Sequence, residues 1–246
     1  MAVSVEVVEP VLFAGVVADE LVALIGDAIA ERGVCTVALA GGSTPGAIYR
    51  CLAKPPRVSE VEWSKVHLFW GDERWVPHTD NQSNFKMTQE TLLAQIHGAP
   101  PQVHPIDTSL PDPESGARAY AEEIRGVLGK DPVFDLVLLG VGEDGHTASL
   151  FPHSPVLRED SVSCAATQHP EDKKARVTLT PGVLRKARRV IFIAKGESKA
   201  DIVRRVLEGT EEPHALPAKL ILTGKEGVEF FLDSGAALRL NRTAVG

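Results

Sequence analysis

The sequence predicts an α/β fold with a doubly wound, mostly parallel, Rossmann-like sheet flanked by helices on both faces. Short apolar runs alternate along the chain with longer segments of helical period, which is typical of this fold class. Loops rich in glycine or charge follow several of the runs, as they do at the carboxyl ends of strands in open parallel sheets. The 246 residues are 43% hydrophobic and contain no linker, so we expect a single domain over residues 1–246.

Eight apolar runs have the length and composition of strands. The first lies near the N-terminus, where apolar and acidic residues alternate without a basic start, and it indicates a strand rather than a signal peptide. The expected strands are Val3–Val8, Thr36–Ala40, Val66–Trp70, Phe134–Leu139, Val162–Ala166, Val177–Leu179, Val190–Ala194 and Val228–Leu232.

Four longer segments have apolar residues at helical spacing. The expected helices are Ala14–Glu31, Asn84–Ile96, Glu114–Leu128 and Ser198–Glu208. Ser83 or Asn84 is expected to cap the second helix, and this needs no further role for either residue. Residues 97–112 and 168–174 are rich in proline or polar residues, so we expect both to be surface connections.

Composition argues against several classes of function. The net charge is −7 and the pI is about 5.6, with scattered basic residues, so neither a nucleic-acid nor an anionic membrane surface is expected. No apolar run approaches transmembrane length. Cys35, Cys51 and Cys164 share no metal-ligand spacing and favour reduced, buried thiols in a cytoplasmic protein without a metal.

The most informative segment, residues 139–152, delivers His146 from a glycine-punctuated turn directly after the predicted strand Phe134–Leu139. Ligands of open parallel sheets bind at this end of the strands, so His146 is a candidate catalytic residue. The alternative is a loop histidine that caps a helix or lies on the surface.

A candidate phosphate cradle follows the second predicted strand. Gly41 and Gly42 let the backbone approach an anion closely, Ser43 and Thr44 add hydroxyl donors, and Pro45 suits the first turn of a helix. The run lacks the lysine and the spacing of a nucleotide P-loop, and a plain strand-to-helix turn is the alternative.

Charged residues follow two further strands. Asp72 and Arg74 alternate with Glu73, which points the other way if the backbone is extended, so we favour a functional site over a solvated ion pair. Arg176 offers a planar fork for phosphate, and Lys199, just inside a predicted helix, adds a point charge. Arg176 and Lys199 are alternatively exposed cations without a ligand.

Together these segments resemble the 6-phosphogluconolactonases within the wider glucosamine-6-phosphate isomerase/deaminase family. The resemblance spans nearly the whole chain, and it departs from the family at residues 167–175, where relatives often have a Ser-Pro-Lys-Pro stretch. The segments that carry it are residues 41–44, 71–77, 142–152, 176–180 and 196–200, in family order.

The resemblance implies hydrolysis of 6-phospho-D-glucono-1,5-lactone to 6-phospho-D-gluconate, with no metal and no organic cofactor. It places the phosphate on residues 41–44 with Arg176 and Lys199, and the reacting carbon near His146 and Asp72. Our hypothesis is that neutral His146 takes a proton from the attacking water and then protonates the ring oxygen. Asp72 orients the imidazole or the water, and Arg74 binds substrate oxygens or the oxyanion.

Two alternatives stay open. The sibling isomerase/deaminase activity uses a carboxylate five residues after the histidine to open the sugar ring, and this chain has Phe151 there, which favours the lactonase. A sugar-phosphate sensor without turnover is the other, although no DNA-binding domain or basic stripe accompanies the motifs. Glu143 and Asp144 can serve the turn alone, and we expect a monomer or weak homo-oligomer.

Overall fold

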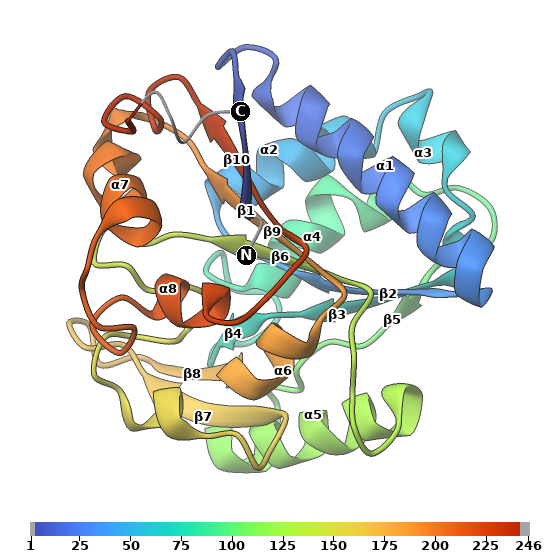
Figure 1. The fold of residues 1–246 in the computed structure, drawn as a ribbon. Helices are drawn as coiled ribbons and strands as arrows, with labels where there is room; N and C mark the ends of the chain where they lie inside the picture. Colours follow the sequence, from blue (N-terminus) through green and yellow to red (C-terminus); the bar gives the residue numbers. More distant parts are fainter. Residues whose placement is uncertain (1–2, 242–246) are drawn as a thin grey trace.

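The apolar runs of the sequence form a parallel sheet of seven strands, which positions the loops discussed above (Figure 1). The structure is a computed structural model that describes residues 3–241. The strand order is β1-β10-β9-β6-β2-β3-β5, and every neighbouring pair is parallel. The strands are β1 (Val3–Val8), β2 (Cys35–Leu39), β3 (Val66–Trp70), β5 (Gln102–Val103), β6 (Leu136–Gly140), β9 (Arg189–Ala194) and β10 (Val228–Asp233).

A second, antiparallel sheet lies beside the first one, and the sequence did not predict it. It has the order β4-β8-β7, with β4 (Asp72–Arg74), β8 (Ala175–Leu179) and β7 (Cys164–Gln168). Gly71 links the two sheets, because its N–H donates to the Leu39 carbonyl of the large sheet and its C=O accepts from Leu179 of the small one. The small sheet therefore lies next to the carboxyl ends of β2 and β3.

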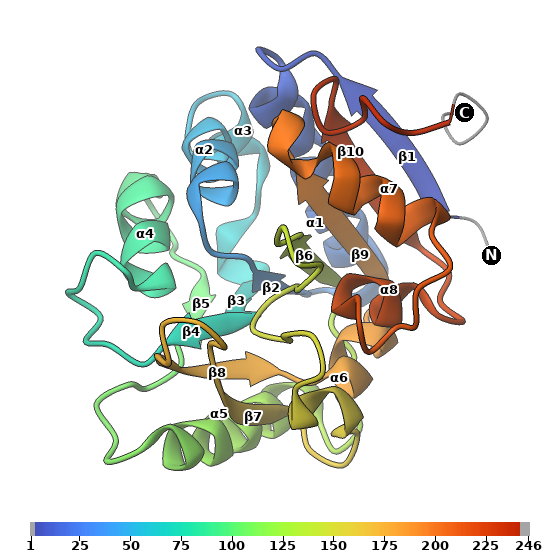
Figure 2. The same cartoon turned by 90° about the vertical axis from the view of Figure 1, so that its left-hand side faces the viewer.

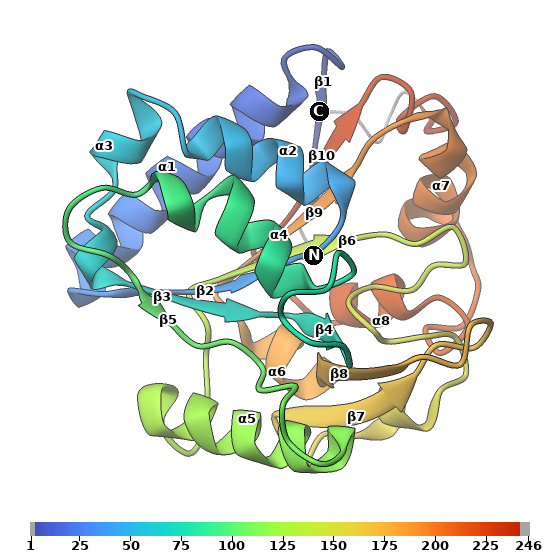
Figure 3. The same cartoon turned by 180° about the vertical axis from the view of Figure 1, so that it is seen from behind.

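Helices cover both faces of the large sheet. α1 (Phe13–Arg32), α2 (Ser43–Leu52), α3 (Arg57–Glu60) and α4 (Asn84–Thr91) lie on one side. α5 (Pro113–Leu128), α6 (Pro181–Lys186) and α8 (Pro217–Leu222) lie on the other, as Figures 1 and 3 show, and α5 packs on β7 and β8. α7 (Ala200–Glu208) packs against α8. The predicted fold class is confirmed.

Most predicted elements lie within two residues of their observed bounds, and the exceptions have local causes. The helix expected over 84–96 ends at Thr91, because Leu92 leaves helical geometry at φ −130°, and a 3₁₀ turn follows at Leu93–Gln95. The helix expected from Ser198 begins as a 3₁₀ turn, Glu197–Lys199. Residues 97–112 are not only a surface connection, since they contain β5 and Ile106, which is 1% exposed.

The core consists of the strands and the apolar helix faces. All five residues of β2 are buried, as are Cys35 and Cys164, whereas Cys51 is half-buried. Among residues 3–241, no helix is long and apolar enough to cross a membrane. No group of three or more His, Cys, Asp or Glu side chains in the same residues is arranged to hold a metal ion.

Candidate active site

A pocket of about 470 Å³ opens at the carboxyl ends of β2, β3 and β6. Figure 2 shows the chain running outward from β2 to β3 on one side and from β6 to β9 on the other. The pocket, lined by residues that follow β2 and β6, therefore lies where the strand order reverses. Six predicted site residues line it, namely Gly41, Asp72, Arg74, His146, Arg176 and Lys199. Gly42, Ser43 and Thr44 are outside the lining, although they adjoin Gly41 at the start of α2.

His146 is held by a tight turn after β6. Its backbone C=O accepts a hydrogen bond from Gly142 N at 2.8 Å, and the Thr147 hydroxyl donates to the Gly140 carbonyl at 2.8 Å. The imidazole lies where a side chain on residue 142 would be, so only glycine fits there. The turn thus fixes the imidazole at the pocket wall.

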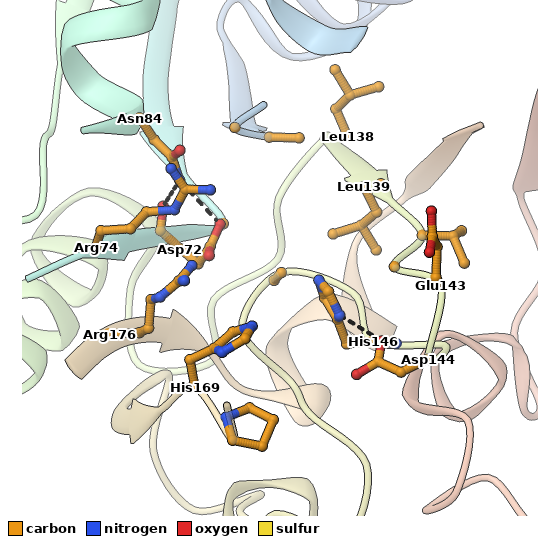
Figure 4. A pocket seen from close by; sticks show the side chains of 18 of the residues that line it. Asp72, Arg74, Asn84, Leu138, Leu139, Glu143, Asp144, His146, His169 and Arg176 are labelled. Atoms are coloured by element: carbon orange, nitrogen blue, oxygen red, sulfur yellow. Dashed lines mark hydrogen bonds and ion pairs between the residues drawn. The ribbon is translucent and has the colours of Figure 1, made fainter. Parts of the chain in front are cut away.

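Asp144 is the carboxylate that orients this imidazole. Its Oδ1 lies 2.6 Å from His146 Nδ1 and also accepts the His146 backbone N–H at 3.0 Å (Figure 4). Burial alone would raise the pKa of Asp144, but the hydrogen bonds and charge of His146 outweigh it and lower the pKa to about 2. An ionised Asp144 accepts a hydrogen bond from Nδ1–H, which leaves the Nε2 lone pair of neutral His146 free to act as a base.

Phe151 packs on His146 from within the protein. The ring centroids are 5.1 Å apart, and Phe151 is 2% exposed. On its other side Phe151 makes an edge contact with His169, at 4.9 Å between centroids. Phe151 therefore supports the imidazole of His146 with a buried apolar ring.

Asp72 does not contact the imidazole in the way we expected. Its Oδ2 accepts a hydrogen bond from Ser149 Oγ at 2.6 Å, and Asn84 Nδ2 lies 3.3 Å from its Oδ1. The expectation that Asp72 orients the imidazole is thus corrected: the tight turn brings Asp144 to Nδ1, while β4 holds Asp72 across the pocket (Figure 4). Ser149 ties Asp72 to the loop of His146.

Glu73 points away from the pocket, as the alternation along β4 predicts. Its carboxylate accepts hydrogen bonds from the backbone N–H groups of Arg74, Asn84 and Phe85 and from Ser83 Oγ, at 2.7–3.0 Å. Burial raises the pKa of Glu73, and these four donors oppose the increase. Glu73 therefore anchors the N-terminus of α4, and Ser83 caps the same helix by accepting the Lys86 N–H.

Arg74 and Arg176 form a pair of like charges beside Asp72. They are directly opposite each other in the β4–β8 register, an arrangement that destabilises a sheet without a counter-ion. Both Nε atoms are buried and have no hydrogen-bond partner among the described residues. Burial lowers the pKa of Arg176, and the nearby Arg74 charge adds to this while Asp72 opposes it. The two unused donors suit an anionic ligand.

The loop at Gly41 closes the pocket from the α2 side. The Asn84 side chain occupies the space where a Cβ on residue 41 would lie, so the loop and α4 are in close contact. Within the described residues no side chain caps the N-terminus of α2, which leaves its first N–H groups free for an anion. Lys199 lines the pocket from the 3₁₀ turn that follows β9.

Sequence reasoning missed several residues of the site. From the sequence Asp144 can serve the turn alone, whereas in the structure it contacts His146, two residues further along the chain. Asn84 had been assigned only to a helix cap, yet it lines the pocket and contacts Asp72. His169 and Glu171 also line the pocket, so residues 168–174 are more than the surface connection that their composition predicts. The departure from the family at residues 167–175 leaves this rim of the pocket open in the sequence, because the placement of both residues depends on the β7–β8 pairing.

Comparison with known proteins supports the family resemblance that the sequence motifs indicate. Residues 9–230 match the family described as glucosamine-6-phosphate isomerases/6-phosphogluconolactonase. The chain belongs to this family. It is 39% identical over 198 residues to a 6-phosphogluconolactonase of Synechocystis sp., covering 79% of this chain and 80% of that protein. It is 37% identical over 235 residues to the Homo sapiens 6-phosphogluconolactonase, covering 89% of each.

Solved structures in this family have the same fold. The 6-phosphogluconolactonase of Trypanosoma brucei superposes with a TM-score of 0.85 at 32% identity, covering 98% of this chain and 99% of that chain. A monomeric glucosamine-6-phosphate deaminase superposes with a TM-score of 0.81 at 21% identity, covering 96% of this chain and 100% of that chain, and this shows the fold alone. The resemblance inferred from the sequence is confirmed.

Proposed function

We propose that this protein hydrolyses 6-phospho-D-glucono-1,5-lactone to 6-phospho-D-gluconate, the lactonase step of the oxidative pentose phosphate pathway. The observation that carries the proposal is the pocket itself, in which an oriented imidazole at His146 faces a pair of arginines (Figure 4). Close relatives named 6-phosphogluconolactonase support the same substrate. A lactone phosphate has both the electrophilic carbonyl and the anion that such a pocket needs.

In the proposed mechanism, His146 Nε2 removes a proton from water as the water oxygen forms a bond to C1. The imidazolium then gives that proton to the ring oxygen while the bond from C1 to this oxygen breaks. Asp144 holds the ring in the required tautomer and stabilises the imidazolium through the 2.6 Å contact. General acid–base catalysis of this kind contributes about 10² to 10⁴ in rate.

The other pocket residues divide between chemistry and binding. Asp72, fixed by Ser149, orients the attacking water, and Arg74 stabilises the oxyanion that develops on the carbonyl oxygen. The phosphate binds at residues 41–44 with Arg176 and Lys199. Because the phosphate is remote from C1, its binding energy orients the ring rather than taking part in the reaction.

The sibling isomerase/deaminase reaction is the second candidate, and Phe151 argues against it. That reaction needs a carboxylate near the histidine to open a sugar ring, and a phenyl ring cannot move a proton. A lactone is already an activated carbonyl and needs no ring opening. A sensor without turnover ranks third, because an Asp144–His146 pair serves no purpose in binding alone.

The proposal also includes a cytoplasmic location and a monomer or weak homo-oligomer. Three free cysteines favour the reducing compartment.

A substrate comparison tests the proposal. The wild-type protein is given freshly prepared 6-phosphogluconolactone, unphosphorylated gluconolactone and glucosamine 6-phosphate in separate assays. We expect fast hydrolysis of the first, a much higher KM for the second, and no release of ammonia from the third. Deamination without lactone hydrolysis would reject the lactonase in favour of the sibling activity, and binding without any turnover would favour the sensor.

A further inference from the structure

β2 and β3 are neighbours in the large sheet, and each loses the strand on its other side just before it reaches the pocket. β2 pairs with β6 only as far as Ala38, and β3 pairs with β5 only at His67 and Leu68. The next residues along each strand continue toward the glycines at 41 and 71, which line the pocket. β2 and β3 stay paired with each other as far as Leu39 and Trp70, but on its other side each strand end has buried backbone groups without a strand beside them, a costly arrangement unless other partners are present.

The hydroxyl of Tyr49 supplies the missing partner for β2. It accepts a hydrogen bond from Ala40 N at 3.0 Å and donates to Ala40 O at 2.9 Å. The Leu39 carbonyl accepts from Gly71 on the β3 side, so the backbone of Ala40, the next residue, is directed to the β6 side. The tyrosine hydroxyl thus occupies the gap between β2 and β6, where the sheet divides to form the pocket.

The hydroxyl of Tyr120 does the same for β3. It accepts from Trp70 N at 2.7 Å and donates to Trp70 O at 3.0 Å. Trp70 is the last residue of β3 and is followed by Gly71 and Asp72. Tyr120 comes from α5, which lies on the other face of the sheet from α2, the helix of Tyr49.

The two tyrosines are the only ones in the sequence, and both have this role. Tyr49 is 0% exposed and Tyr120 is 2% exposed. Burial raises the pKa of both phenols, so each hydroxyl keeps its proton and can donate as well as accept. A phenylalanine in either place would leave one buried N–H and one buried C=O without a partner.

We propose that Tyr49 and Tyr120 are positioning residues that act through the strand ends on two separate parts of the site. Tyr49 fixes Ala40, and through it the Gly41 loop that holds the substrate phosphate. Tyr120 fixes Trp70, and through it Asp72 and Arg74, which act at the reacting carbonyl. The division between phosphate and carbonyl rests on the lactonase function proposed above.

The test compares Tyr49→Phe and Tyr120→Phe with the wild-type protein, well below the melting temperature of each. Tyr49→Phe is expected to raise KM about 10-fold with little change in kcat, and Tyr120→Phe to lower kcat about 10-fold with little change in KM. A displacement of about 1 Å in an active site costs up to about 10²-fold, so these effects are within reach of a lost anchor.

Thr36→Val is the matched control. Thr36 lies at the opposite end of β2, and its buried hydroxyl also makes two hydrogen bonds, donating to Asp135 Oδ2 at 2.9 Å and accepting from Asp135 N at 3.0 Å. The control is expected to lower the melting temperature and to leave kcat and KM unchanged. Tyrosine variants that behave like Thr36→Val, with lower stability but wild-type kinetics, would overturn the positioning role.

A second measurement is made on the wild-type protein and needs no turnover. Growth with 3-fluorotyrosine labels only these two positions and gives two ¹⁹F signals. The signals are assigned with Tyr49→Phe and Tyr120→Phe, each of which lacks one of them. Titration with inorganic phosphate is expected to shift the Tyr49 signal more than the Tyr120 signal. Equal or absent shifts despite phosphate binding would contradict the inference. A wild-type protein that binds phosphate but leaves the lactone intact would reject the lactonase function and leave the Tyr49 result standing.

Discussion

At the scale of single residues, the pairing of Asp144 with His146 defines the chemistry of the site. The hydrogen bond from Nδ1 fixes which ring nitrogen carries the proton, and the base of the proposed reaction is the other nitrogen. Asp72, held by Ser149 Oγ, lies across the pocket from His146 and is expected to orient the water. The two carboxylates therefore have different partners and different expected tasks.

Replacing Asp144 by asparagine should lower kcat far more than it changes KM. The amide keeps the shape of the side chain but not its charge, so it stabilises the imidazolium less and permits the wrong tautomer. We expect a loss in kcat of about 10²-fold or more, within the range of general acid–base catalysis. Steady-state kinetics check this, with Asp27→Asn on the exposed face of α1 as the control. A wild-type kcat in Asp144→Asn would remove Asp144 from the mechanism.

The lowered pKa of Asp144 also predicts how stability depends on pH. The folded pKa of about 2 lies below the unfolded value of about 3.9, so the stabilisation from ionised Asp144 is present above pH ~4 and is lost as pH falls toward 2. Urea unfolding between pH 2 and 5 should therefore show the wild type losing its advantage over Asp144→Asn. A difference between them that stays constant with pH would contradict the assignment.

The sequence predicted the polar residues of the site better than their contacts. His146, Asp72, Arg74 and Arg176 all line the pocket, because residues that follow parallel strands meet at one edge of a sheet. The sequence leaves Asp72 to orient either the imidazole or the water, and the structure gives the imidazole contact to Asp144, since hydrogen-bond geometry in a turn depends on dihedral angles that residue types do not specify. His169 was missed because its approach to the pocket results from long-range pairing.

At the scale of elements, β4 is the segment that joins the site to the fold. It is three residues long, and its two sides have different functions: Asp72 and Arg74 face the pocket, while Glu73 receives the N-terminus of α4. Alternation along an extended backbone was readable from the sequence. Its pairing with β8 was not, because three polar residues give no strand signal without their partner.

Glu73→Gln should destabilise the protein through α4. The amide NH₂ would face N–H and O–H donors that the carboxylate now accepts from, so we expect a loss of about 1–3 kcal/mol in the free energy of unfolding. Denaturant titration measures it. Glu90→Gln, at the exposed end of the same helix, is the control and should change stability by less than about 1 kcal/mol. Equal effects of the two substitutions would show that Glu73 is not an anchor.

At the scale of the whole molecule, the pocket combines loops from both halves of the sheet. The reversal of strand order at β2 and β6 brings the Gly41 loop and the His146 loop together, and the small sheet adds the arginines. The alternation of short, mostly apolar runs with segments of helical period predicted this architecture. The small sheet was not predicted, because the runs that form β7 and β8 do not specify which sheet they join.

The arginine pair is expected to lower the stability of the free protein and to strengthen the binding of an anionic ligand. Arg74 and Arg176 lie directly opposite each other across β4 and β8, where like charges destabilise a sheet, so Arg176→Met should be at least as stable as the wild type without ligand. A ligand at about 100 times its Kd adds about 2.7 kcal/mol to stability, and we expect 6-phosphogluconate to raise the melting temperature of the wild type much more than that of Arg176→Met.

The control for this experiment is Arg204→Met on α7, outside the pocket lining. It should keep the full ligand-induced increase in melting temperature. An equal increase in Arg176→Met and the wild type would place the phosphate elsewhere.

The most direct test of the account is proton release during hydrolysis of freshly generated 6-phosphogluconolactone, measured for the wild type, for His146→Ala and without enzyme. We predict rapid acid release with the wild type and a loss of about 10²-fold or more in His146→Ala, which should keep the wild-type circular dichroism spectrum. A folded His146→Ala protein that hydrolyses the lactone at the wild-type rate would contradict the central role of this histidine, and a wild-type rate equal to the blank would reject the lactonase itself.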